Sequence, residues 1–120
     1  MKSTKFEIEF GVVAGFTDST TPEAVALEKV IAAWKEAALN VFKETKIFVS
    51  AQFSTATVIY PFGPSVVSET VVAVSGISNP KFQAADSYKE SVKRVCERVK
   101  IGLKQKTATL LLSEVESVRI

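Results

Sequence analysis

The sequence contains no histidine and only one cysteine, Cys96. Histidine is the commonest general base, the commonest transition-metal ligand and the usual switch near neutral pH. Its absence excludes a Ser-His-Asp or Cys-His nucleophile built within this chain. One thiol can form neither an internal disulfide nor a zinc site, and we expect Cys96 to be a buried structural thiol. We therefore expect no metal and no cofactor.

Long apolar runs are absent as well. No stretch approaches the roughly 18–20 apolar residues that cross a bilayer, so we expect no membrane segment. The first residues lead into alternating polar and apolar side chains and show no apolar signal-peptide core. The expected location is therefore the cytoplasm, where a lone cysteine stays reduced.

Charge is scarce in the middle of the chain and crowded after it, although the net charge is only +2. Residues 47–80 contain one charged side chain, Glu69, whereas residues 81–106 contain eight lysines and arginines against three acidic residues. Such a basic segment can bind nucleic acid or an acidic partner, and it can equally be a solvated helix face. Its candidate residues are Lys89, Lys93, Arg94, Arg98, Lys100 and Lys104.

The first half of the chain predicts a strand, a helix and a second strand. Residues 5–16 begin with alternating apolar and polar side chains, which is typical of a half-buried strand. After a loop of turn residues, Thr20 or Thr21 can cap a helix over residues 22–44. Residues 47–60 are rich in β-branched and aromatic side chains without a helical period, which indicates a long strand.

The second half predicts the same three elements. A turn at residues 61–64 leads into a strand over residues 66–77. A Ser-x-x-Glu capping box at residues 87–90 opens a second helix that runs to about Leu103, and residues 107–120 form the last strand. The apolar stripe of this helix consists of Tyr88, Val92, Val95, Cys96, Val99 and Leu103.

The order βαββαβ predicts one α+β domain over residues 1–120, of 13.0 kDa. Its simplest solution is ferredoxin-like, a four-stranded antiparallel sheet with both helices on one face. The halves also superpose without a gap at an offset of 61 residues, so that Trp34 falls on Val95 and Glu36 on Glu97. Any chain with two βαβ halves shows such a pseudo-twofold internal repeat, and the repeat therefore supports the fold without requiring a gene duplication.

The apolar pattern of two strands shifts by one residue, near Ser54 and near residues 113–114. A shift of one residue indicates a β-bulge or a strand that changes the surface on which it packs. We therefore expect either two ordinary bulges or strand ends that pair with a neighbouring subunit.

The sheet face away from the helices is expected to be uncharged. Small polar residues there cost little to desolvate, whereas solvated sheet faces usually carry lysine and glutamate. We expect this face to bind a small molecule, a protein partner or a second copy of the chain, as a homodimer or homotrimer. The candidate ligand-binding residues are Ser50, Gln52, Ser54, Tyr60, Ser68 and Thr70, with Phe48 and Val72 beside them.

Catalytic chemistry without histidine would have to use carboxylates and tyrosine. If the last strand lies beside the first, acidic residues of both strands converge, and one of them gains a raised pKa. Tyr60, before the rigid turn, can act as a phenolic acid or simply pack with its hydroxyl in water. The acidic candidates are Glu7, Glu9, Glu114 and Glu116, which Arg119 can balance.

Three functions remain open at this point. The first is a small homo-oligomeric module that binds a small molecule or partner through its uncharged face. The second is a cofactor-independent enzyme of the isomerase or lyase type, with carboxylate and tyrosine groups at a subunit boundary. The third is a binder of nucleic acid or an acidic partner through the second helix, and the lack of aromatic residues in the third strand argues against RNA. No motif in the sequence identifies a family.

Overall fold

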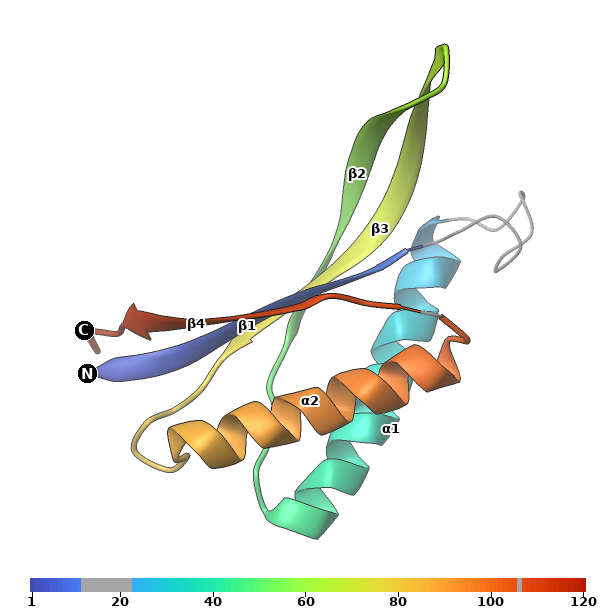
Figure 1. Cartoon of the computed structure of the whole chain (residues 1–120). Helices are drawn as coiled ribbons and strands as arrows, with labels where there is room; N and C mark the ends of the chain where they lie inside the picture. The colour runs from blue at the N-terminus through green and yellow to red at the C-terminus, as the bar shows by residue number, and fades with distance from the viewer. Residues whose placement is uncertain (12–22, 106) are drawn as a thin grey trace.

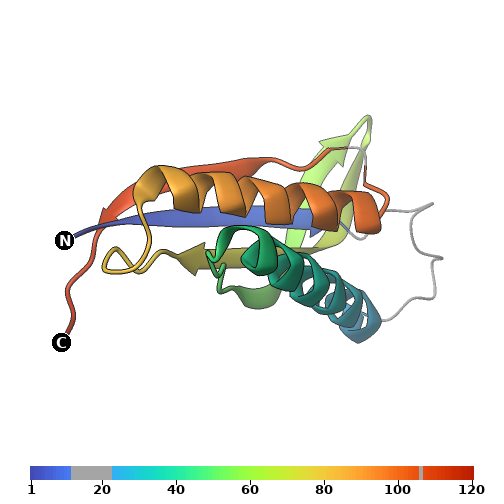
Figure 2. The same cartoon turned by 90° about the horizontal axis from the view of Figure 1, so that it is seen from below.

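The computed structural model describes residues 1–11, 23–105 and 107–120. The elements follow in the order β1 (Lys2–Gly11), α1 (Glu23–Thr45), β2 (Gln52–Phe62), β3 (Ser65–Ile77), α2 (Ala85–Gly102) and β4 (Leu110–Glu116). The strands form one antiparallel sheet in the order β2-β3-β1-β4, and both helices cover the same face of it (Figure 1, Figure 2). The predicted ferredoxin-like α+β fold is confirmed.

The core lies between the sheet and the two helices. Phe6, Ile8 and Phe10 alternate along β1 and point into it. Trp34 of α1 stacks on Phe6 with ring centroids 5.6 Å apart and meets Phe53 edge to face at 6.0 Å. The predicted stripe of α2 is buried along its whole length, as the helical spacing indicated.

The strand predicted from Ile47 begins five residues later, at Gln52. The backbone before it is bonded to side chains instead of to a strand. Gln83 donates to the Phe48 carbonyl at 2.7 Å, and the Trp34 indole N–H donates to the Val49 carbonyl at 3.4 Å. The predicted start of β2 is therefore wrong, because these two side chains replace the strand ladder there.

Two other boundaries also differ from the prediction. The capping box is wrong because α2 already begins at Ala85, and its N-cap residue, Ala84, forms no side-chain cap. The last strand is shorter than predicted, because β4 pairs only with β1 and the Ser117 amide bonds to the carbonyl of Met1. Residues 12–16 of the predicted first strand, and the proposed caps at Thr20 and Thr21, lie outside the described residues.

The pairing registers run without interruption, from 52↔75 to 62↔65 between β2 and β3 and from 2↔116 to 8↔110 between β1 and β4. Within these paired segments, the bulge interpretation of the two apolar shifts is therefore wrong. The apolar series of β2 instead moves to the sheet face away from the helices, which we call the open face. The open face carries Lys5, Glu7 and Glu9 of β1, alternate β2 residues from Gln52 to Phe62, alternate β3 residues from Ser65 to Ile77, and Leu111, Ser113 and Val115 of β4.

The outer part of the β2–β3 hairpin projects beyond the helices (Figure 1). Its turn contains Gly63 in the left-handed region, at φ +63°, which glycine adopts without steric cost. The hairpin gives the chain an extent of 49 Å and a radius of gyration of 15.7 Å. A compact domain of this length has a radius of gyration of about 14 Å. The projecting strands are thus covered by no helix of the described chain.

Candidate active site

A hollow of about 710 Å³ lies on the open face and is lined by three glutamates, Glu7, Glu9 and Glu69. Glu7 and Glu9 alternate along β1, and Glu69 comes from β3, the neighbouring strand. Small and apolar side chains of all four strands complete the wall, together with residues 107–109 before β4. We call this cavity the acidic hollow. Three carboxylates on an otherwise uncharged wall favour a cationic ligand.

The predicted convergence of Glu7 and Glu9 with Glu114 and Glu116 is wrong. Glu114 pairs with Thr4 and Glu116 with Lys2, so both point to the face opposite Glu7 and Glu9. There they pair with positive groups. The amino terminus lies 2.9 Å from Glu116, and Lys2 Nζ lies 3.7 Å from Glu114 and 3.9 Å from Glu116. These surface ion pairs remove both carboxylates from the candidate site, whereas Arg119 lines a separate hollow at the chain termini.

Tyr60 belongs to the same face as Glu69. The register pairs Val58 with Glu69 and Tyr60 with Val67, which makes Tyr60 and Glu69 diagonal neighbours across the hairpin. Desolvation raises the pKa of Tyr60, and a side-chain hydrogen bond with Glu69 raises it further. The phenol therefore stays protonated at neutral pH and donates to the carboxylate. This contact holds the Glu69 side chain at the rim of the acidic hollow.

A second hollow, of about 410 Å³, adjoins the acidic one. It is lined by Lys5, Ser50, Gln52, Ile77 and neighbouring backbone, and Ser75 lines both hollows. Lys5 Nζ lies 3.1 Å from Glu7 Oε1, so this ion pair joins the two walls. Two of the predicted ligand residues, Ser50 and Gln52, thus lie beside the glutamates.

The other neutral candidates are divided between the two faces of the hairpin. Ser54 shares the open face with Gln52. Ser68 and Thr70 pair with Ile59 and Thr57 and therefore face the other way, and Val72 is fully buried in the core. The prediction that all of them share one surface is wrong, because apolar residues occupy both faces of β3 and alternation cannot fix its orientation.

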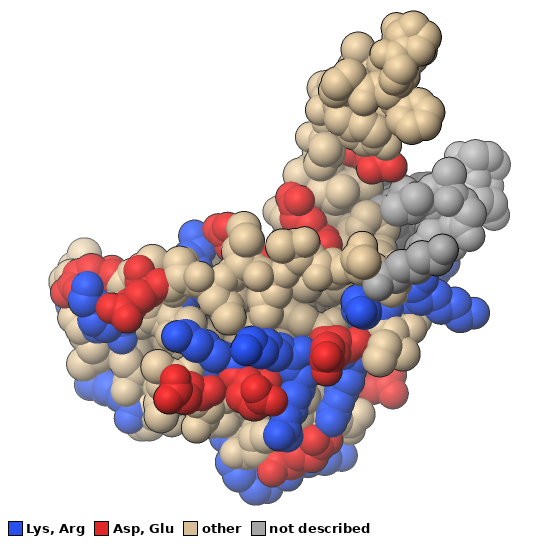
Figure 3. Space-filling view, in the orientation of Figure 1, with Lys and Arg blue, Asp and Glu red and all other residues tan. Residues whose placement is uncertain are grey.

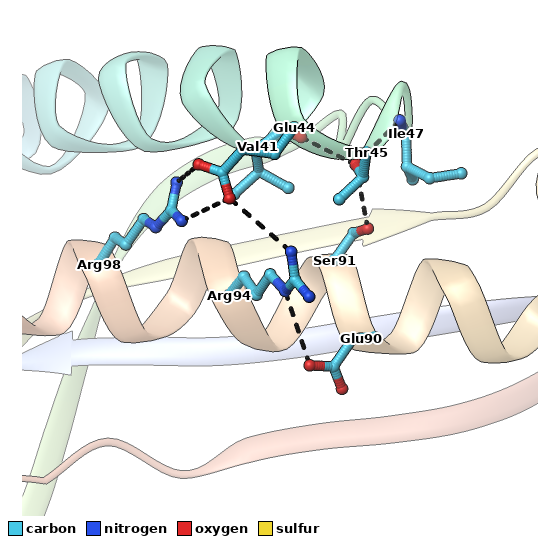
Figure 4. A network of polar contacts seen from close by, with 8 residues as sticks. All are labelled: Val41, Glu44, Thr45, Ile47, Glu90, Ser91, Arg94 and Arg98. Atoms are coloured by element: carbon cyan, nitrogen blue, oxygen red, sulfur yellow. Dashed lines mark hydrogen bonds and ion pairs between the residues drawn. The ribbon is translucent and has the colours of Figure 1, made fainter.

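Two of the six basic candidates on and after α2, Arg94 and Arg98, pair with acidic residues. Arg98 forms a two-pronged contact with Glu44 of α1, at 2.7 and 2.8 Å, and Arg94 lies 3.7 Å from both Glu44 and Glu90 (Figure 4). Positive and negative side chains are interleaved over this helix, whereas the hairpin is uncharged along its outer length (Figure 3). The interleaved acidic residues lower the positive potential of this face, which disfavours the third function.

Cys96 and Tyr88 are buried in the core beneath α2. Burial raises the pKa of the Cys96 thiol to about 12, and burial, with a smaller contribution from Cys96, raises that of Tyr88 to about 12. A thiol that stays protonated is a poor nucleophile. The prediction of a structural cysteine is thus confirmed. In the described part of the chain, no cluster of three or more acidic or cysteine side chains is placed to hold a metal ion.

Comparison with known proteins identifies the family. The model of the SAM lyase family matches residues 1–119. The chain belongs to the SAM lyase family. A search of curated protein sequences gives no significant match.

Solved structures share the fold of this SAM lyase family member. A phage SAM lyase in the apo state has a TM-score of 0.61 and 17% identity, covering 92% of this chain and 79% of the other. A phage SAM lyase in complex with S-methyl-5'-thioadenosine has a TM-score of 0.62 and 16% identity, covering 93% and 81%. A point mutant of CutA1 from Pyrococcus horikoshii has a TM-score of 0.51 and 13% identity, covering 97% and 86%.

Membership of the SAM lyase family places the chain among enzymes that process a small molecule. This agrees with the lyase alternative and makes the acidic hollow a candidate active site. Sequence reasoning did not single out Glu69 as a site residue. The available signal was its isolation as the one charged side chain of residues 47–80. No helix in the described residues is long and apolar enough to cross a membrane.

Proposed function

We propose that this protein is a cofactor-independent lyase that splits S-adenosylmethionine and releases S-methyl-5'-thioadenosine. The family assignment supports the reaction type, and a phage SAM lyase has been solved with that thioadenosine. The observation that carries the proposal is the set of three glutamates in one hollow. The substrate carries positive charge on its sulfonium and its α-ammonium group, and carboxylates are the side chains that stabilise both.

The bond that breaks joins sulfur to the γ-carbon of the methionine moiety. Its electron pair goes to sulfur, which leaves as a neutral thioether. The substrate's own carboxylate forms the new bond to that carbon and closes a five-membered lactone, so the single net positive charge remains on the ammonium of the lactone. This route needs no water, no external base and no cofactor, and its barrier falls when the chain is held in a folded conformation.

The three glutamates and Tyr60 would have distinct tasks in this reaction. Glu69, fixed by its hydrogen bond with Tyr60, adds negative charge to the acidic hollow and so favours binding of the sulfonium substrate. Glu7 and Glu9 lie on the neighbouring strand and face the rest of the cationic substrate. These are electrostatic and positioning tasks, which side chains can perform without a histidine.

We also propose that the enzyme is a homo-oligomer with the site at a subunit boundary. The hairpin exposes large apolar side chains on both of its faces, with Ile59 68%, Phe62 70% and Val66 73% exposed. Monomeric proteins rarely expose such contiguous apolar surface. Since Tyr60 and Glu69 lie on this same hairpin, a second copy packed against it would close the acidic hollow from outside.

The test is to incubate the purified protein with S-adenosylmethionine and to measure S-methyl-5'-thioadenosine by chromatography. We expect release by the wild type and a loss of about 10²-fold in kcat/KM for Glu69→Gln, since the change removes one preorganised charge. The matched control is Glu97→Gln on α2, which lies outside the acidic hollow and is expected to keep full activity. Absence of thioadenosine with the wild type, or equal activity of Glu69→Gln and wild type, would contradict the proposal.

A further inference from the structure

One positive side chain lies among the negative ones of the candidate site. Of the described residues that line the acidic hollow and the second hollow, Lys5 is the one cation, against three glutamates. Lys5 lines the second hollow, and its ammonium lies 3.1 Å from Glu7, which lines the acidic hollow. Lys5 therefore lies at the boundary between the two hollows. The boundary therefore presents a positive and a negative group side by side.

We propose that Lys5 and Glu7 together bind the amino-acid end of the substrate, Lys5 its carboxylate and Glu7 its α-ammonium. This inference rests on the proposed function and names the residues that select the substrate. The charges of the site are complementary to those of S-adenosylmethionine. The sulfonium and the α-ammonium of the substrate are positive and meet the three glutamates, and its carboxylate is negative and meets Lys5. Lys5 contacts one oxygen of that carboxylate and leaves the other free to attack the γ-carbon.

Replacing the ion pair between Lys5 and Glu7 with contacts to the substrate costs little free energy. The Lys5 and Glu7 side chains are 43% and 52% exposed, and an exposed ion pair of this kind is held weakly. A zwitterionic ligand replaces that one contact with two charge-assisted contacts, which are stronger than neutral hydrogen bonds. Ser75 pairs with Glu7 on one side and with Gln52 on the other, so the neighbours of the pair across β3 are neutral.

The position of Lys5 also separates it from the other cations near the open face. Lys81 and Arg119 line a third hollow, of about 610 Å³, at the end of the sheet that holds the chain termini. That hollow contains none of the three glutamates of the acidic hollow. A ligand whose sulfonium lies against Glu9, two residues from Glu7 on the same face, therefore has Lys5 as its nearest cation in the two hollows.

Two unreactive ligands test the assignment by isothermal titration calorimetry. S-adenosylhomocysteine and S-methyl-5'-thioadenosine both have a neutral thioether and the same nucleoside, and only the first has an amino-acid end. For Lys5→Met and for Glu7→Gln we expect the Kd of S-adenosylhomocysteine to rise about tenfold, as for loss of one charge-assisted contact. The Kd of S-methyl-5'-thioadenosine is expected to stay unchanged.

The matched control is Lys2→Met, which removes the same charge from the same strand on the opposite face, where Lys2 pairs with Glu114 and Glu116. It should bind both ligands as the wild type does. An unchanged affinity of Lys5→Met for S-adenosylhomocysteine, or an equal loss for both ligands, would overturn the inference. If the wild type still releases thioadenosine in that case, the proposed function stands and only the assignment of Lys5 and Glu7 falls. If the wild type binds neither ligand and releases no product, both fall.

Discussion

At the scale of single residues, Gly76 shows how tightly β3 is fitted into the fold. It lies opposite Phe6 on the core face, and a methyl group there would clash with the Ser50 carbonyl oxygen and the Phe6 ring. We expect Gly76→Ala to lower the free energy of unfolding by about 3 kcal/mol, as for an overpacked core. Urea denaturation measures this directly.

The control for Gly76 is Gly102, the last residue of α2. Apart from its chain neighbours and the backbone of its own helix, no described atom lies within 4 Å of a methyl group built there. Gly102→Ala should therefore keep or raise the stability by up to about 1 kcal/mol, because alanine is the better helix former. Equal urea midpoints for Gly76→Ala and the wild type would show that β3 moves to accommodate the added methyl group. The register of β3 behind the acidic hollow would then not be fixed.

The candidate site shows what single residues can reveal before a structure exists. Glu7 and Glu9 could be found because a strand with alternating carboxylates is a local pattern. Glu69 could not be found in this way. It reaches the same hollow through the pairing of β1 with β3, which joins residues about 60 positions apart in the sequence. Glu114 and Glu116 were assigned to the wrong face for the same reason, since one residue of register reverses every side chain of a strand.

At the scale of elements, the two helices are joined by Glu44. The Arg98 guanidinium hydrogen-bonds to Glu44 and, with smaller contributions from its charge and that of Arg94, holds the pKa of Glu44 below its usual range (Figure 4). A carboxyl whose pKa is lowered by folding stabilises the native state above the unfolded pKa, and this stabilisation is lost as the pH falls through the lowered folded value. We expect Glu44→Gln to be less stable than the wild type at pH 7, and the difference to disappear as the pH falls through the lowered pKa of Glu44.

Thermal unfolding at a series of pH values checks the role of Glu44. The effect should be small and should shrink in high salt, since these side chains are exposed. Glu36→Gln on the same helix serves as the control, because Glu36 forms no ion pair within the described residues. A difference between Glu44→Gln and the wild type that persists at low pH would show that the loss comes from packing instead of charge.

Element order and the buried face of α2 were predictable because they depend on local spacing, and the apolar stripe of α2 repeats at the helical period. Element ends were less predictable, since side chains distant in sequence decide them. Gln83 and Trp34 bond to the backbone before β2, and the end of β4 depends on where β1 begins. The orientation of β3 lay beyond sequence reasoning, because valines occupy both of its faces from Val66 to Val74.

At the scale of the whole molecule, the proposed assembly depends on the hairpin. It exposes Ile59, Phe62 and Val66, and it carries the Tyr60–Glu69 contact between them. We expect light scattering after size exclusion to give two or three times 13.0 kDa for the wild type. Ile59→Ser with Phe62→Ser should give a folded monomer, because both side chains are mostly solvent-exposed in the single chain and their substitution removes little internal contact.

Activity of the monomeric variant then tests the position of the site. If a second copy closes the acidic hollow, the double variant should bind S-methyl-5'-thioadenosine more weakly and lose turnover, although Glu7, Glu9 and Glu69 are all retained. The control is Leu39→Ser on α1, which removes another exposed apolar side chain and should leave mass and turnover unchanged. A monomeric wild type with full activity would show that one chain supplies the complete site.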